Sequence, residues 1–94
     1  MGAIRMIKYN KNNFVQKIGD EIILHSEKTG NNIFLNETAT VIYENIHEGV
    51  SMDNLLTRIA SIYNEEKETI LSDVKQTIDT LVEEGVLLVE SEEL

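Results

Sequence analysis

NIFLNETATVIY, residues 32–43, changes its hydrophobic period from two to nearly four within a dozen residues. Ile33, Phe34 and Leu35 form a β-branched and aromatic run, which is typical of a strand. Asn36 follows as a helix N-cap, because its side-chain oxygen can accept a hydrogen bond from a free N–H of the first turn. Apolar residues then recur at the spacing of one helix face. They are Ala39, Ile42, Tyr43 and Ile46. The stretch therefore predicts a strand that runs directly into a helix.

Length and composition indicate a small globular protein. The 94 residues suit one domain, and a hydrophobic fraction of 41% without a long polar tract predicts a packed core. No apolar run approaches the roughly 18 residues of a membrane span, and no signal-peptide core is visible. The chain has no cysteine, which excludes disulfides, thiolate catalysis and zinc–thiolate sites. We therefore expect a cytoplasmic protein with no membrane partner.

The net charge of −9 is distributed unevenly. Residues 1–30 carry five basic and three acidic side chains, whereas residues 31–94 carry three basic and fourteen acidic ones. Such a surface repels the phosphate backbone, so we expect no nucleic-acid partner. Two interpretations of the acidic half stay open. It consists of solvated helix faces that keep the protein in solution, or it faces a partner with complementary basic groups.

The first third of the chain predicts two further strands, Phe14–Ile18 and Glu21–Ser26. The Gly19-Asp20 pair between them fits a two-residue type II′ hairpin, in which Gly supplies the positive φ. A polar loop with Thr29-Gly30 leads into the strand that starts at Asn32. Three strands joined by short turns predict an antiparallel meander. Residues 1–13 form either a loose arm or an additional edge strand.

The remainder of the chain predicts three helices. The first runs from Glu37 to His47, and the second, Met52–Tyr63, is capped by Ser51. Asn64 is the expected N-cap of the third helix. Apolar residues then recur at helical spacing until Gly85, which is expected to end this helix. Val86–Val89 is then a packed strand or an apolar anchor.

Together these elements predict an α+β fold of winged helix-turn-helix type. A three-stranded antiparallel N-terminal sheet is followed by three helices, with residues 14–89 as the domain and residues 90–94 as a frayed acidic tail. Oligomeric state stays open between monomer and homodimer, because an exposed edge strand or the N-terminal arm can pair two copies.

The sequence shows no set of residues suited to catalysis. His25 lies in a predicted strand and His47 at a helix end, and we interpret both as local structure. The neighbouring carboxylates Glu65-Glu66 and Glu83-Glu84 fit solvated helix ends. There is no glycine-rich phosphate loop and no serine in a nucleophile elbow. We therefore predict no enzyme activity, no metal site and no cofactor.

Binding is the function that the predicted fold favours. The third strand is expected to be a free sheet edge, with the third helix beside it, and a peptide can add to such an edge as a further strand. Because strand residues alternate faces, Ile33 and Leu35 point one way and Phe34 the other, and the sequence leaves open whether Phe34 faces the groove. The predicted peptide-binding residues are Asn32, Ile33, Phe34 and Leu35 on the strand and Leu71, Val74, Lys75 and Ile78 on the helix.

Several short motifs resemble, in the right order, those of the PqqD-like proteins. Leu35-Asn36-Glu37-Thr38-Ala39 followed by Ile42-Tyr43 resembles an LNxTAxxIW signature, with Tyr43 in place of the common Trp. Glu48-Gly49-Val50-Ser51 is similar to the family's DGx turn, with Glu48 in place of Asp. Further similar segments are Ile59-Ala60-x-x-Tyr63, Asp73-Val74 and Leu81-x-x-x-Gly85-Val86-Leu87. The resemblance covers residues 14–88.

This resemblance implies a peptide-binding adaptor. PqqD-like domains are RiPP precursor recognition elements, which bind the leader of a ribosomally made precursor peptide on the third strand, along the third helix. They deliver the peptide to a modifying enzyme such as a radical SAM protein, a protease or a cyclase. The resemblance is to stand-alone members, as in pyrroloquinoline quinone and lasso-peptide biosynthesis.

Two other functions are alternatives to a peptide-binding adaptor. A structural subunit of a modification enzyme would bind the enzyme and ignore free leader peptide. A winged-helix DNA-binding regulator needs a basic recognition helix, whereas residues 65–84 carry two lysines against seven acidic residues.

Overall fold

The predicted transition from strand to helix is present in the computed structural model, which describes residues 4–47 and 49–92. β4 (Asn32–Leu35) ends one residue before α1 (Glu37–Glu44) begins. Asn36 caps the helix, because its side-chain oxygen accepts a hydrogen bond from the Ala39 N–H at 2.8 Å. The local chemistry of this stretch therefore decides where the sheet ends and the helices start.

The first sheet has the predicted meander topology. β2 (Phe14–Ile18) pairs antiparallel with β3 (Glu21–His25), which pairs antiparallel with β4. The turn between β2 and β3 has Gly19 at φ 60°, as the first central position of a type II′ turn requires. The predicted hairpin is confirmed.

A second sheet brings together segments that are distant in the sequence. Its order is β5 (Val50–Ser51), β1 (Ile4–Tyr9) and β6 (Leu87–Glu92), and all pairs are antiparallel. The sequence left open whether the N-terminal residues form an arm or a strand, and residues 4–9 form a strand. The expected fraying from residue 90 is wrong as far as Glu92, because β6 pairs with β1 up to that residue. Residues 1–3 and 93–94 of the predicted arm and tail lie outside the described residues.

The three predicted helices are present, with two corrected ends. α2 (Met52–Tyr63) has the predicted bounds, and Ser51 caps it through the Asn54 N–H at 3.1 Å. α1 ends at Glu44, three residues earlier than predicted, because the Asn45 side chain bonds the Val41 carbonyl at 2.8 Å.

The start of the third helix was predicted wrongly. α3 is Lys67–Glu83 with Glu66 at its N-cap position, whereas Asn64 is the C-cap of α2. Asn64 adopts the left-handed conformation with φ 53° and ψ 47°, which Asn tolerates better than most residues do. Asn is favoured at both kinds of cap, so its identity alone could not decide between them.

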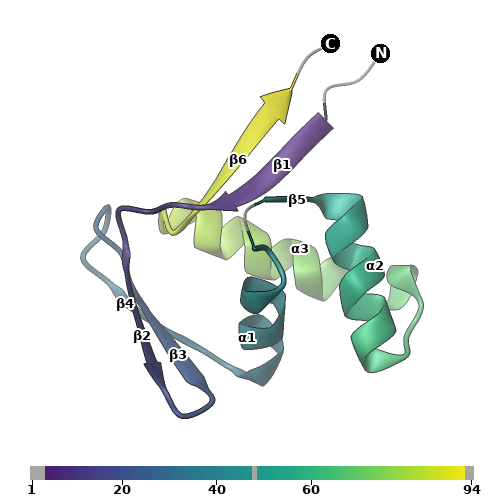
Figure 1. The fold of residues 1–94 in the computed structure, drawn as a ribbon, viewed down its shortest axis with the longest axis horizontal. Helices are drawn as coiled ribbons and strands as arrows, with labels where there is room; N and C mark the ends of the chain where they lie inside the picture. The colour runs from purple at the N-terminus through teal and green to yellow at the C-terminus, as the bar shows by residue number, and fades with distance from the viewer. Residues whose placement is uncertain (1–3, 48, 93–94) are drawn as a thin grey trace.

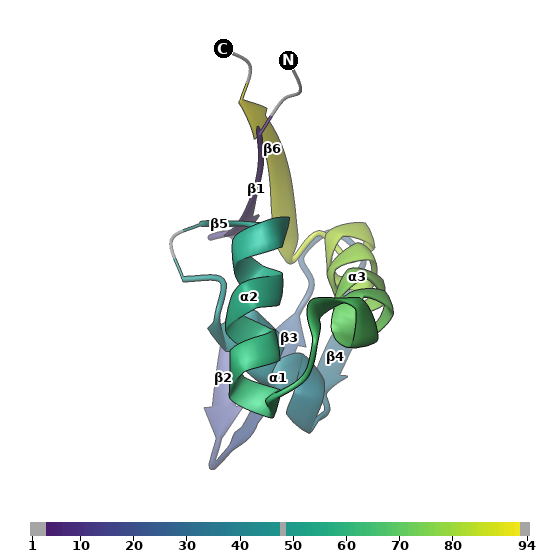
Figure 2. The same cartoon turned by 90° about the vertical axis from the view of Figure 1, so that its right-hand side faces the viewer.

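One apolar core lies between the first sheet, the three helices and the start of β6. Figure 2 shows the helices covering one face of the first sheet, while β1 and β6 extend away from them as a two-stranded ribbon. The α+β class is confirmed, but the prediction contained only the first sheet and missed the second. The least exposed large side chains of the core are Leu24, Ile42, Ile46, Leu55, Ile59, Leu81, Leu87, Val74 and Val86.

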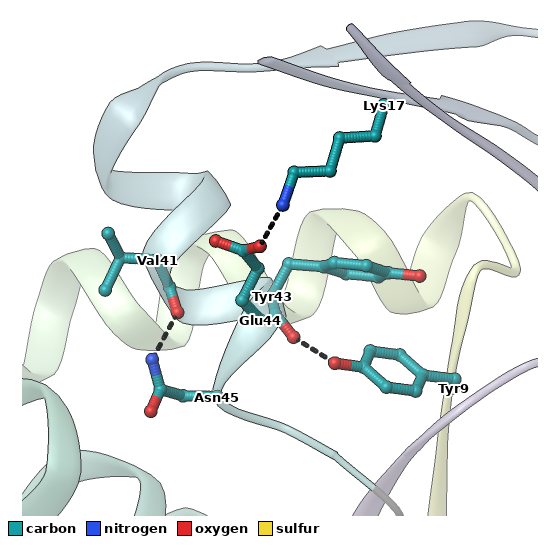
Figure 3. Close-up of polar contacts among 6 residues, drawn as sticks. All are labelled: Tyr9, Lys17, Val41, Tyr43, Glu44 and Asn45. Carbon is teal, nitrogen blue, oxygen red and sulfur yellow. Dashed lines mark hydrogen bonds and ion pairs between the residues drawn. The ribbon is translucent and has the colours of Figure 1, made fainter. Parts of the chain in front are cut away.

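Two tyrosines connect the second sheet to α1 (Figure 3). The Tyr9 hydroxyl donates a hydrogen bond to the Tyr43 carbonyl at 2.5 Å and accepts one from the His47 N–H at 3.2 Å. The two rings are 4.6 Å apart between centroids. Burial raises the pKa of Tyr9 and raises the pKa of Tyr43 to about 12. Both phenols therefore stay protonated in the folded protein at a pH where an unfolded chain would already ionise.

We expect ionisation of these two tyrosines to lower the free energy of unfolding at high pH. Unfolded Tyr titrates near pH 10, so the stability is complete below pH 10 and falls as the pH rises toward 12. At pH 11 the Tyr43 share of the loss is about 1 kcal/mol. Urea unfolding at pH 8 and pH 11 measures it, with Tyr43→Phe as the comparison. An equal loss for both proteins would contradict the assignment.

Candidate functional site

A groove lies between the edge strand β4 and α3. β4 ends the order β2-β3-β4, so among the described residues one side of it carries no further strand. The space has a volume of about 500 Å³. We call it the β4–α3 groove. Its lining residues are Ile33 and Leu35 of β4, Asn36, Thr38 and Ala39 at the start of α1, and Asp73, Gln76, Thr77, Thr80 and Leu81 of α3.

The main chain of Phe34 faces the open edge of β4. The Ser26 N–H donates a hydrogen bond to the Asn31 carbonyl at 2.9 Å, so these two opposite residues form a hydrogen-bonded pair of the antiparallel ladder. Such pairs recur at every second residue along the strand. Because main-chain groups alternate along a strand, Ile33 and Leu35 direct theirs toward β3. The N–H and C=O of Phe34 therefore point to the side where another strand can pair.

The side chains of β4 alternate as predicted. Leu35 is 8% exposed and Ile33 is partly buried, whereas Phe34 is 72% exposed. The side chain of Phe34 therefore lies outside the β4–α3 groove, on the opposite face of the sheet. The strand register places three more apolar residues on that face. We call the set the outer apolar face: Phe14, Ile18, Ile23 and Phe34.

Asn32 lies at the start of β4, next to His25 on the outer side of the sheet. Its side-chain oxygen is 2.5 Å from Nδ1 of His25, whose ring also lies 5.3 Å from the ring of Phe14. The contacts of His25 are thus those of a strand residue that orders its neighbours.

The helix wall of the groove differs from the predicted one. Val74 and Ile78, only 1% and 2% exposed, belong to the core, and the exposed Leu71 lies away from the groove. Lys75 lines a shallow hollow on the neighbouring face of α3, with Ser72 and Asp79. This hollow shares Gln76 and Thr80 with the groove. The apolar side of α3 packs against the core, so the polar side next to it on the helix faces β4. Its residues are Asp73, Gln76, Thr77 and Thr80.

The spacing of this flank was a usable signal. Asp73, Thr77 and Thr80 are separated by four and three residues, which places them on one side of a helix. The prediction missed these polar residues because it assigned the apolar residues of α3 to peptide binding, whereas they are needed for the core.

One end of the groove is held by contacts of Glu84, the residue after α3. The Ser26 hydroxyl bonds the Glu84 carbonyl, and the Thr29 hydroxyl bonds the Glu84 carboxylate at 2.5 Å. The Asn31 amide donates to the same carboxylate at 3.2 Å. These Glu84 contacts attach the β3–β4 loop to the C-terminal end of α3.

A second hollow of about 280 Å³ lies beside the groove, away from the Glu84 contacts. Thr38 and Asp73 line both spaces, so the two spaces lie next to each other. We call the second space the α2–α3 hollow. Its lining residues are Thr38, Ile59, Tyr63, Glu65, Thr69, Ile70, Asp73 and Val74.

Neither space contains a recognisable reaction centre. Within residues 4–47 and 49–92, no three His, Asp or Glu side chains are grouped so that they could hold a metal ion. No helix in that part of the chain is long and apolar enough to cross a bilayer. The arrangement offers a strand edge and a wall of side chains, which suit binding.

Comparison with known proteins gives one family and two related structures. The family model described as coenzyme PQQ synthesis protein D (PqqD) matches residues 21–87. TbiB1, solved in complex with the TbiA(beta) leader peptide, is 21% identical with a TM-score of 0.74, over 85% of this chain and 93% of that one. No protein of curated function matches the sequence.

The second structure is the NMR structure of the PqqD truncation of Methylobacterium extorquens PqqCD, described as a functional and stand-alone RiPP recognition element. It is 10% identical with a TM-score of 0.69, over 88% of each chain. At these identities the two structures show a shared fold.

The alternation of β4 predicts opposite outcomes for two neighbouring substitutions. Leu35→Ala removes a buried side chain and is expected to lower the free energy of unfolding by about 3 kcal/mol. Phe34→Ala removes an exposed one and is expected to change it by less than about 0.5 kcal/mol. Urea denaturation followed by circular dichroism measures both. A larger loss for Phe34→Ala would show that β4 lies in the opposite register.

Proposed function

Because the chain belongs to the PqqD family, we propose that it is a recognition element that binds the leader segment of a ribosomally synthesised precursor peptide. Domains of this family are generally non-catalytic binding domains. The observation that carries the proposal is the open edge of β4, whose Phe34 main chain faces the β4–α3 groove. The solved relative TbiB1 binds a leader peptide, which supports it further.

The leader binds as a further strand of the first sheet. Its main chain pairs with the N–H and C=O of Phe34, which supplies affinity independent of sequence. Its side chains alternate, so those on either side of the paired residue enter the groove beside Ile33 and Leu35. The side chain of the paired residue lies on the other face, beside the ring of Phe34. Selectivity comes from the residues that enter the groove.

The bound peptide is presented to a modifying enzyme, for which a radical SAM protein, a protease or a cyclase are the candidates that the family resemblance implies. Binding itself requires no cofactor. The outer apolar face lies on the side of the sheet opposite the groove, so an enzyme can contact it while the leader is bound.

Strand addition predicts a specific sensitivity to the main chain of the leader. The probe is a fluorescent synthetic leader from a precursor encoded beside the gene, and binding is measured by fluorescence anisotropy. N-methylation removes a main-chain donor without changing a side chain. For a leader strand antiparallel to β4, we expect N-methylation of the residue opposite Phe34 to weaken binding at least about tenfold, and methylation of the next residue to have little effect.

A matched pair of protein variants locates the groove. Thr77→Arg places a long side chain in the β4–α3 groove and is expected to abolish leader binding. Ser72→Arg makes the same kind of change on another face of α3 and is expected to keep it. Equal affinity for both variants would remove the groove from the proposal.

The outer apolar face favours a second candidate function, a structural subunit of a modification enzyme. The exposed side chains of Phe14, Ile18 and Phe34 give this face an apolar surface that a partner can cover. Such a subunit would bind the enzyme and would not bind free leader.

Phe14→Ser and Ile18→Ser separate the two functions. We expect these variants to bind leader as the unchanged protein does, and to bind the purified modifying enzyme encoded beside the gene at least about fivefold more weakly. Isothermal titration calorimetry measures both affinities. Tight enzyme binding without any leader binding by the unchanged protein would favour the structural subunit.

A further inference from the structure

The α2–α3 hollow combines an apolar interior with an acidic rim. The partly buried Ile70 of α3 supplies its accessible apolar surface, and the almost fully buried Ile59 and Val74 lie behind it. Glu65 and Asp73 supply the only charges among the residues that line it. No lysine or arginine lines either this hollow or the β4–α3 groove.

Some acidic side chains of the protein pair with a lysine, but these two carboxylates, like most of the others among the described residues, do not. Asp53 pairs with Lys67 at 3.2 Å and Glu44 pairs with Lys17 at 3.2 Å. Among the described residues, the side chains of Glu65 and Asp73 have no hydrogen bond or ion pair with any other group. Their negative potential is therefore uncompensated at the mouth of a hollow.

The position of the hollow decides which ligand can reach it. β4 ends at Leu35, and the groove beside it borders the hollow at Thr38 and Asp73. The opposite end of the groove is held by the Glu84 contacts. A peptide strand paired with β4 therefore runs toward the hollow, and a side chain beyond the paired segment enters it.

The lining selects the chemistry of that side chain. An acidic side chain would meet two like charges, and a purely apolar one would remove water from the carboxylates without giving them a partner. A lysine or arginine has an apolar stem that can lie against Ile70, and a cationic end that stays at the rim. The ring of Tyr63, which also lines the hollow, can contact such a cation on its face.

We propose that the α2–α3 hollow receives a lysine or arginine of the leader peptide, with Asp73 and Glu65 as the residues that select for it. The inference rests on the proposed function and adds the class of substrate, a leader that carries a basic residue just beyond the strand-forming segment. Asp73 is the central residue, because it lines both spaces and borders the path between them.

The test combines changes in the peptide and in the protein. Labelled synthetic leader peptides are prepared with each lysine or arginine replaced singly by glutamine, and anisotropy gives Kd for each. We expect one replacement to raise Kd about fivefold, and the same replacement to have no effect on Asp73→Asn. Peptide carrying glutamate at that position is expected to bind best to Asp73→Lys, which reverses the charge preference.

Asp79→Asn is the matched control. It makes the same change of charge on the same helix, but Asp79 lines the shallow hollow with Lys75. We expect it to leave the selectivity unchanged. If Asp73→Asn and Asp79→Asn changed the selectivity for the basic residue equally, the cause would be the net charge of the protein and not a local contact with Asp73. That result would overturn the inference.

Failure of the inference and failure of the proposed function give different results. Leaders that bind equally well with and without their basic residues overturn the inference and leave the proposed function intact. Absence of binding by any leader overturns the proposed function and the inference with it.

Discussion

The Glu84 contacts are the constraint on which the binding surface depends. They attach the β3–β4 loop, through Ser26, Thr29 and Asn31, to the C-terminal end of α3. β4 and α3 are thereby held together at one end, while the groove between them stays open along the strand and borders the α2–α3 hollow. The β3–β4 loop is attached to the end of α3, while the rest of the helix packs its apolar side chains into the core and leaves the edge of β4 uncovered.

The use of apolar residues explains why this groove is polar. A domain of this size needs most of its large apolar side chains for one core, and α3 contributes Val74, Ile78 and Leu81 to it. The flank that remains for the groove carries threonine, glutamine and aspartate. Main-chain pairing therefore supplies the general affinity in the proposed complex, and the polar flank with its acidic end supplies the selectivity.

The sequence predicted local features well and non-local ones poorly. The Asn36 cap, the Gly19 turn and the Ser51 cap depend on neighbouring residues, and all three were found as predicted. The pairing of β1 with β6 joins opposite ends of the chain, and no short-range pattern encodes it. The wall of the groove depends on how α3 is rotated against the core. The apolar stripe was recognised, but its contacts could not be assigned until the positions of the first sheet and α2 were known.

The pairing of β1 with β6 also separates the ends of the described chain from the groove. Ile4 and Glu92 are neighbours in the register, and the ribbon that holds them extends away from the helices (Figure 1). A short linker between them would close the backbone into a circle, and a new opening at the Gly19-Asp20 turn would give a circular permutant with the same sheets. In such a permutant the order of the elements would change while β4 and α3 stayed connected as they are. The architecture of the binding surface is thus independent of where the polypeptide starts.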